Sequence, residues 1–192
     1  MRLILPILTN NRSGSLSDFI SFWSNIYSYD DSEKYEFIHN DILSKSDLTQ
    51  LYEWKNGMKL SVSKTNSLKS KIIKKLDIIN SLKAEENIDI DEFLKEFKNV
   101  SVVWKIFLLH IINPKIYPIY DQHIHRAFRF INNQSTEGIN ASINEKDKLN
   151  FYFVEYLPFV TRTGETDLKK MDEAFFAFGQ FINIGNQKIL AE

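Results

Sequence analysis

The sequence of 192 residues contains no cysteine. This absence excludes disulfides, thiolate zinc sites, cysteine-ligated iron–sulfur clusters and a cysteine nucleophile. Six glycines and four prolines are too few for the frequent turns of a many-stranded β-sandwich or barrel. Hydrophobic residues nevertheless make up 43% of the chain and aromatic residues 14%, enough for a large core. The composition therefore favours an α-rich globular fold.

Long apolar segments are also lacking. The opening stretch Met1–Leu8 is too short for a signal peptide. The longest apolar run, Val102–Ile112, is too short to span a bilayer and contains Lys105 and His110. We therefore expect a soluble, cytoplasmic protein without a membrane partner.

The formal net charge is only −1, which gives no overall signature of a nucleic-acid partner. Charge is nevertheless unevenly distributed along the chain. The segment from Lys55 to Lys83 contains eight lysines and one acidic residue, whereas the segment from Glu85 to Glu96 contains six acidic residues and one lysine. The lysine-rich segment is either a solvated helix face or a surface that contacts phosphates.

Apolar residues recur at helical spacing along most of the chain, so we expect an all-α fold. The expected helices cover residues 16–27, 35–39, 46–56, 68–79, 89–97, 100–112, 121–131, 149–160 and 168–182. The helix at 100–112 is apolar on nearly every side and should be buried. We expect a short extended linker at 115–120 and a polar surface loop at 132–144.

Four polar or glycine positions are the expected helix boundaries. Serine and aspartate side chains cap helix N-termini, and glycine ends helices in the left-handed conformation. The expected N-caps and the glycine C-cap are Ser15 or Ser13, Ser46, Asp89 or Asp91, and Gly57.

The segment from Phe97 to Ala127 carries the most informative pattern. Its second half reads Asp121-Gln-His-Ile-His-Arg126 and resembles, position by position, the Asp-x-His-Val-x-Arg motif of the helix-hairpin-helix DNA glycosylase superfamily. If Phe97 stands where this family has the leucine of its hairpin, the distance to Asp121 equals that of endonuclease III-type members. The chain departs from the family at the hairpin itself, where Asn99 and Ser101 replace two glycines.

This resemblance implies two helical lobes with an active cleft between them. A helical barrel with a degenerate hairpin would cover residues 30–114, and a second lobe would combine residues 1–29 and 115–192. The resemblance further implies double-stranded DNA as the partner, a monomer, and no cofactor. Since there is no cysteine, the iron–sulfur cluster of some members is excluded.

Asp121 is the expected catalytic residue. When an N-glycosidic bond breaks, the sugar acquires oxocarbenium character, and an adjacent carboxylate stabilises that charge and orients water. An aspartate at a helix N-terminus suits this role because the N–H groups there favour its anion. The alternative is that Asp121 is an ordinary N-cap.

The remaining candidates have DNA-binding roles. Rings can stack against a flipped base, although core packing is the default role for each of them; the candidates are Trp104, Tyr120, Trp54 and Tyr117. The candidate phosphate contacts are His123, Arg126, Asn99, Ser101, Lys55, Lys69, Lys71 and Lys75. His123 has the alternative of a plain surface or capping residue, and Arg126 that of an internal ion pair.

No metal site is expected, because His123 and His125 are two residues apart on a helix and do not share a face. The resemblance implies a monofunctional DNA glycosylase that removes a damaged base, or a phage-type modified base in a defence role. Val103 occupies the position of the nucleophilic lysine of bifunctional members, and Lys105 follows two residues later. A non-catalytic DNA-binding module and a helical protein-interaction domain remain the alternatives.

Overall fold

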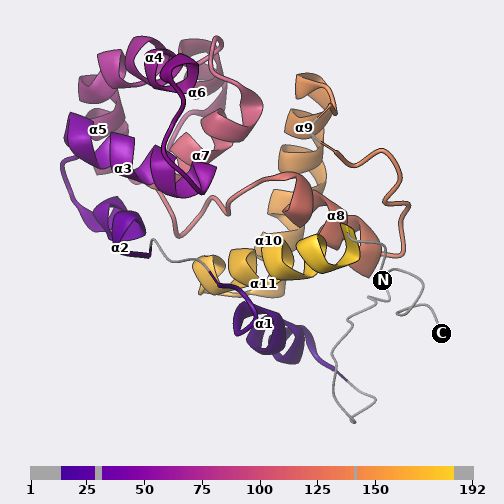
Figure 1. Ribbon diagram of the computed structural model, residues 1–192. Helices are drawn as coiled ribbons and strands as arrows, with labels where there is room; N and C mark the ends of the chain where they lie inside the picture. Colours follow the sequence, from indigo (N-terminus) through magenta and orange to yellow (C-terminus); the bar gives the residue numbers. More distant parts are fainter. Residues whose placement is uncertain (1–13, 29–31, 141, 184–192) are drawn as a thin grey trace. The chain divides into compact units, whose positions relative to one another are not determined.

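A computed structural model describes residues 14–28, 32–140 and 142–183, and these residues form helices, turns and loops without any β-strand (Figure 1). The expected all-α class is therefore confirmed. The chain divides into two compact units, one of residues 1–28 and 118–192 and the other of residues 29–117. No helix in the described part of the chain is both long and apolar enough to cross a membrane.

The unit of residues 29–117 consists of short helices. They are α2 (Ser32–Tyr35), the 3-10 helix η1 (Glu36–His39), α3 (Lys45–Asn56), α4 (Val62–Lys71), the 3-10 helix η2 (Ile73–Lys75), α5 (Leu76–Ala84), α6 (Ile90–Glu96) and α7 (Val102–Ile112). Helix α7 forms its core, since the side chains of residues 105–112 are all buried. The ring of Phe107 stacks on that of Trp54 from α3 at a centroid distance of 5.9 Å.

The other unit contains α1 (Leu16–Ser24), α8 (Gln122–Ile131), α9 (Glu145–Asn150), the π-helix η3 (Phe151–Tyr156), α10 (Leu157–Thr163) and α11 (Leu168–Phe181). Helix α11 packs against both α1 and α8. Phe19 and Trp23 of α1 meet Phe178 of α11 at ring-centroid distances of 5.3 and 5.0 Å. These buried rings form the core that joins the first helix of the unit to its last.

Several expected helix boundaries are confirmed. Ser15 caps α1, Asp89 caps α6, and Gly57 ends α3 with φ 72° in the left-handed conformation. The alternative cap Ser13 lies outside the described residues.

The expected cap Ser46 was wrong, because Ser44 caps α3. The Ser44 hydroxyl accepts from the backbone N–H of Asp47, whose carboxylate accepts from the N–H of Ser44 in return. This reciprocal pair satisfies two backbone donors at once, which Ser46 has no acid at the right spacing to do.

The expected single helix at 68–79 is broken. Helix α4 ends at Lys71, a 3-10 turn follows, and α5 begins at Leu76. The break occurs at Ile72, whose backbone leaves the helical region at φ −120° and ψ −60°. Ile72 and Ile73 are consecutive β-branched residues, which have restricted side-chain rotation and lower helix propensity.

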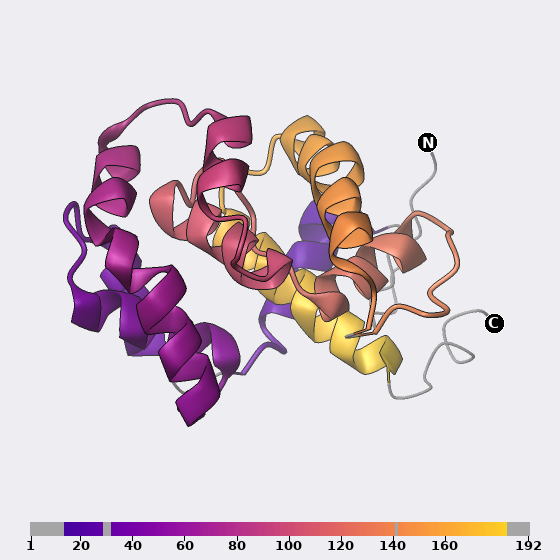
Figure 2. The same ribbon diagram turned by 90° about the horizontal axis from the view of Figure 1, so that it is seen from above.

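The expected helix at 149–160 is present, but it begins at Glu145 and contains a π-helical turn. Helices α9, η3 and α10 run on without interruption from Glu145 to Thr163 (Figure 2). The linker at 115–120 is extended only in its second half, because Ile116 and Tyr117 both donate backbone hydrogen bonds to the carbonyl of Asn113. The described residues of the loop at 132–144 form neither helix nor strand, as expected.

Candidate active site

Asp121 is the N-cap residue of α8. Its backbone is extended, and its Oδ1 atom accepts hydrogen bonds from the backbone N–H groups of His123 at 2.8 Å and Ile124 at 3.0 Å. The side chain is half-buried. Two N–H donors at the positive end of a helix stabilise the negative charge of a carboxylate. Asp121 is thus a fixed, partly exposed carboxylate, and the same bonds serve the capping role that the sequence left open.

Side chains from η3 and α11 form hydrogen bonds with the backbone immediately before Asp121. The hydroxyl of Tyr152 donates to the carbonyl of Pro118 at 2.9 Å, and the N–H of Ile119 donates to Oδ2 of Asp172 at 2.7 Å. All four side chains are buried. The carbonyl of Pro118 and the N–H of Ile119 are therefore bound by η3 and α11 where the chain enters α8.

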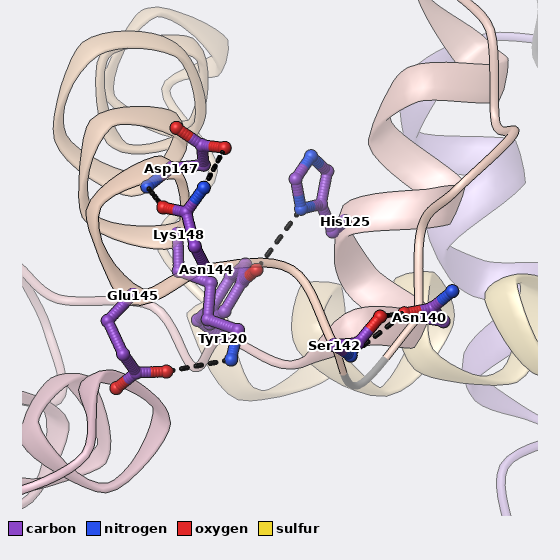
Figure 3. A network of polar contacts seen from close by, with 8 residues as sticks. All are labelled: Tyr120, His125, Asn140, Ser142, Asn144, Glu145, Asp147 and Lys148. Atoms are coloured by element: carbon purple, nitrogen blue, oxygen red, sulfur yellow. Dashed lines mark hydrogen bonds and ion pairs between the residues drawn. The ribbon is translucent and has the colours of Figure 1, made fainter.

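Tyr120 lies in the core of its unit and contacts His125 (Figure 3). Its Oη atom is 3.1 Å from Nδ1 of His125, and the imidazole stacks on the ring of Phe151 with centroids 3.6 Å apart. Burial, assisted by the positive charges of Arg129 and Arg126, lowers the pKa of His125 to about 3. His125 is therefore a neutral core residue at physiological pH.

The hydrogen bonds of His125 also indicate its tautomer. Nε of Arg129 donates to Nε2 of His125 over a long 3.4 Å. Because a guanidinium has no acceptor, Nε2 must carry the lone pair and Nδ1 the proton. Nδ1 of His125 then donates to the Tyr120 hydroxyl oxygen, and burial together with the nearby charges of Asp121 and Glu145 raises the pKa of Tyr120.

Other polar residues near Tyr120 organise the start of α9. Figure 3 shows Asn144, whose side chain caps this helix by accepting from the N–H of Asp147 at 2.8 Å. Glu145 pairs with Lys148 at 2.8 Å within the first turn of α9. These contacts are local to α9 and fix where the loop at 132–144 ends.

Arg126 is buried and binds backbone carbonyls. Its guanidinium donates to the carbonyl of Gly179 at 3.0 Å and to that of Ile139 at 2.7 Å, and it lies 3.2 Å from Nδ1 of His123. Burial lowers the pKa of Arg126, and the negative charge of Asp121 acts in the opposite direction. These carbonyl contacts join α8, α11 and the loop at 132–144.

His123 is half-buried, and its ring meets that of Phe176 edge-on with centroids 5.0 Å apart. Because the Arg126 guanidinium can only donate, Nδ1 of His123 is the acceptor in their contact. His123 therefore lies in the first turn of α8, the turn that Asp121 caps.

Three of the four candidate base-stacking rings are core residues. Trp54, Tyr117 and Tyr120 are 6%, 7% and 1% exposed, so their faces are covered by the protein's own side chains. Trp104 is half-buried and packs against Tyr52 with ring centroids 4.9 Å apart. Tyr120, the candidate ring next to Asp121 in the chain, therefore has no exposed face.

The remaining aromatic candidates belong to the unit of residues 29–117. Trp54 contacts Tyr35 at 4.7 Å between ring centroids, and Tyr35 in turn hydrogen-bonds to the buried His110 at 2.8 Å. Nδ1 of His110 lies 2.7 Å from the carbonyl oxygen of Tyr117. Tyr35 and His110 therefore connect Trp54 to Tyr117 through one ring contact and two hydrogen bonds.

The turn between α6 and α7 contains Asn99 and Ser101, the residues expected to replace the glycines of a hairpin. Phe97 and Val100 are buried, whereas Asn99 and Ser101 are exposed. No residue of this turn has a positive φ, although a glycine-containing hairpin permits one. Ser101 caps α7 by position only, without a side-chain hydrogen bond to the helix.

The candidate lysines fall into two groups. Lys69 and Lys71 are exposed on α4, a helix without acidic residues in its first turn, whereas Leu68 and Ile72 beside them are buried. Lys75 differs because it pairs with Glu96 at 2.9 Å and covers the ring of Phe97 at 5.0 Å. Lys55 is half-buried near the end of α3. The two exposed candidates, Lys69 and Lys71, therefore both lie on α4.

Sequence reasoning missed the residues of α11 that support Asp121. Asp172 is four residues after Leu168 and three before Phe175, so it falls on the apolar stripe of α11 and is 3% exposed. A charged residue on such a stripe is the signal that identifies it. Gly179 continues the same stripe, and a Cβ atom there would lie 2.0 Å from the carbonyl oxygen of His123.

A pocket of about 360 Å³ opens within the same unit. It is lined by His125 and Arg129 of α8, by Ile139 and Ile143 of the loop, and by Asp147, Asn150, Phe151 and Glu155. Among residues 14–28, 32–140 and 142–183, no group of three histidines, aspartates or glutamates is placed to hold a metal ion.

Comparison of the chain with protein-family models, with curated proteins and with solved structures finds no match.

Proposed function

We propose that this protein is a monofunctional DNA glycosylase that flips a damaged or modified base out of double-stranded DNA and hydrolyses its N-glycosidic bond. The observation that carries the proposal is the carboxylate of Asp121, which is fixed at the N-terminus of α8 by two backbone N–H groups. It stands within Asp121-Gln-His-Ile-His-Arg126, the part of the chain that resembles the glycosylase motif.

The chemistry assigned to Asp121 is electrostatic. As the bond between C1′ and the base nitrogen breaks, the base leaves with the electron pair and positive charge develops on the sugar. The Asp121 carboxylate stabilises this charge and orients a water molecule, whose oxygen bonds to C1′. The proton released by the water neutralises the departing base, which leaves an abasic site.

The two hydrogen bonds from the helix cap favour this role because they fix the orientation of the carboxylate. Oδ1 accepts both N–H groups of the cap. A carboxylate held in this way needs little reorganisation when a cation forms beside it.

Two further features of the chain are compatible with the proposal. Helices α6 and α7 are joined by a short turn with Asn99 and Ser101 exposed, where the proposed resemblance puts the family's hairpin. We propose that the backbone of this turn contacts a DNA phosphate. The units of residues 29–117 and of residues 1–28 with 118–192 would correspond to the family's two lobes.

A DNA-binding module without catalytic activity is the second candidate function. The exposed Lys69 and Lys71 of α4 favour it, because concentrated positive charge attracts a polyanion whether or not chemistry follows.

The test is the formation of abasic sites in a panel of duplexes that contain damaged bases or phage-type modified bases. We expect the protein to release base from at least one duplex without a cofactor. Salt-dependent binding of duplex DNA without base release would support the DNA-binding module instead. If the protein neither releases base nor binds duplex DNA, both proposed DNA functions are excluded.

A further inference from the structure

We propose that Asp172 is a positioning residue for Asp121, acting through the backbone of segment 118–120. The inference rests on the proposed function for its catalytic meaning, but its geometry belongs to the fold alone. Asp172 lies on α11, 53 residues along the chain from its backbone partner Ile119.

Asp172 uses both carboxylate oxygens. Oδ2 accepts from the N–H of Ile119 at 2.7 Å, and Oδ1 accepts from the hydroxyl of Tyr156 at 3.1 Å. The Asp172 side chain is 3% exposed and that of Tyr156 is fully buried. Hydrogen bonds to a buried charged acceptor are stronger than those between neutral groups, and losing one leaves an unsatisfied donor in the core.

The bond to Ile119 controls the direction in which the chain enters α8. The carbonyl of Pro118 is held by the hydroxyl of Tyr152, and Oη of Tyr120 is held by His125. With Ile119 bound by Asp172, each residue from 118 to 120 has a buried polar partner. Asp121 follows directly, so its place at the helix terminus is set by Tyr152 of η3 and Asp172 of α11 together with His125 of α8 itself.

The surroundings of Tyr156 connect the two carboxylates. Burial is the main reason that the pKa of Tyr156 lies well above its ordinary value. The charge and hydrogen bond of Asp172 raise this pKa further, and the charge of Asp121 adds to it. The charges of both aspartates therefore act on one buried hydroxyl, whereas the geometric link from Asp172 to Asp121 is the hydrogen bond from Ile119, two residues before Asp121.

A carboxylate is needed at position 172 because it must accept two hydrogen bonds at once. In Asp172→Asn the amide keeps one acceptor oxygen, and its NH₂ group can only donate. The bond to Ile119 or that from Tyr156 is therefore weakened. Tyr156→Phe is the matched control, since it removes the second bond and leaves Asp172 free to hold Ile119.

The experiment is amide hydrogen exchange measured by NMR in the wild type, Asp172→Asn and Tyr156→Phe. In Asp172→Asn we expect exchange at Ile119, His123 and Ile124 to accelerate about tenfold relative to Phe175, a core amide of α11. Tyr156→Phe should change these ratios by less than about threefold. Comparison with Phe175 removes any effect of lower overall stability.

Faster exchange at Ile119 with unchanged His123 and Ile124 would overturn the proposal, because Asp172 would then hold the linker without fixing the Asp121 cap. Equal acceleration at all four amides would also overturn it and assign Asp172 a general structural role. The variant Asp172→Ala supplies the same comparison if Asp172→Asn retains its bonds.

Activity gives a second and separable readout. If a substrate duplex is found, Asp172→Asn should lower kcat by about 10- to 100-fold with little change in KM, since DNA contacts are left intact. If the wild type releases no base from any duplex, the proposed function fails. The exchange experiment then still decides whether Asp172 positions Asp121.

Discussion

Gly179 of α11 lies against the backbone of His123 in the first turn of α8, so closely that a Cβ atom would stand 2.0 Å from the carbonyl oxygen of His123 and 2.5 Å from its carbonyl carbon. Backbone atoms on both sides leave no flexible group to move aside. The absence of a side chain at residue 179 is therefore what allows α11 to support the turn that Asp121 caps.

Gly179→Ala should separate these two helices. In an open helix this change is stabilising, but here the two backbones must shift, and we expect a loss of about 3 kcal/mol in the free energy of unfolding. Urea denaturation measures this loss. Gln180→Ala, at an exposed neighbouring position, is the control and should change stability by less than about 0.5 kcal/mol. A Gly179→Ala protein as stable as the wild type would refute the close contact.

Stability should fall in acid because His125 resists protonation in the folded protein. Its pKa is lowered to about 3 from 6.5, so below pH 6.5 the unfolded chain binds a proton that the folded chain does not. The contribution of His125 is complete above pH 6.5 and decreases at up to about 1.4 kcal/mol per pH unit as the pH falls toward 3.

This dependence is measured by denaturant unfolding at several pH values between 7 and 4. His125→Gln removes the titrating group, so its stability should depend less steeply on pH than that of the wild type. Parallel curves for the two proteins would contradict the neutral, buried state of His125.

The exposed lysines of α4 should contribute to DNA affinity. Replacing Lys69 and Lys71 by Gln should lower the slope of log affinity against log salt by about 0.9 for each phosphate that the lysines neutralise. Adding Lys75→Gln should also reduce stability, because Lys75 pairs with Glu96 and covers Phe97. The control replaces the exposed Lys146 and Lys170 of the other unit. An unchanged slope in the Lys69 and Lys71 variant would place DNA on another surface.

No covalent Schiff base should form with substrate DNA. In the proposed resemblance Val103 replaces the nucleophilic lysine, and Lys105 is only 5% exposed on α7. A Schiff base requires an amine that reaches C1′. Borohydride treatment during turnover should therefore trap no protein–DNA adduct. An adduct that disappears in Lys105→Ala would show that Lys105 acts as the nucleophile.

The sequence predicted those parts of the fold that depend on neighbouring residues. The burial of α7 follows from its apolar composition, and the left-handed end of α3 follows from Gly57. The choice of Ser44 over Ser46 as a cap was also local, since it depends on Asp47, but the reciprocal bond was missed. The break at Ile72 also has a local signal in the two consecutive β-branched residues, whereas helical periodicity does not distinguish the π-helical turn at 151–156 from an α-helix.

The candidate site was predictable only in part, for the same reason. Asp121 as a helix cap follows from the residues around it, whereas its support comes from Asp172 and Gly179, more than 50 residues further along the chain. The hydrogen bonds of Arg126 to the carbonyls of Gly179 and Ile139 were likewise not predictable from the sequence. Burial separates a surface ligand from a structural one, and burial is set by the fold.

The most direct test of the central claim is base excision by Asp121→Asn. Asparagine is nearly isosteric with aspartate and keeps an oxygen that can accept from the N–H groups of His123 and Ile124, so the fold should be retained. We measure abasic-site formation on the duplex that the wild type processes, with circular dichroism and urea denaturation to verify folding. The account predicts a loss of excision of about 100-fold or more, because the neutral amide does not stabilise an oxocarbenium ion. A folded Asp121→Asn protein that excises base at the wild-type rate would contradict it.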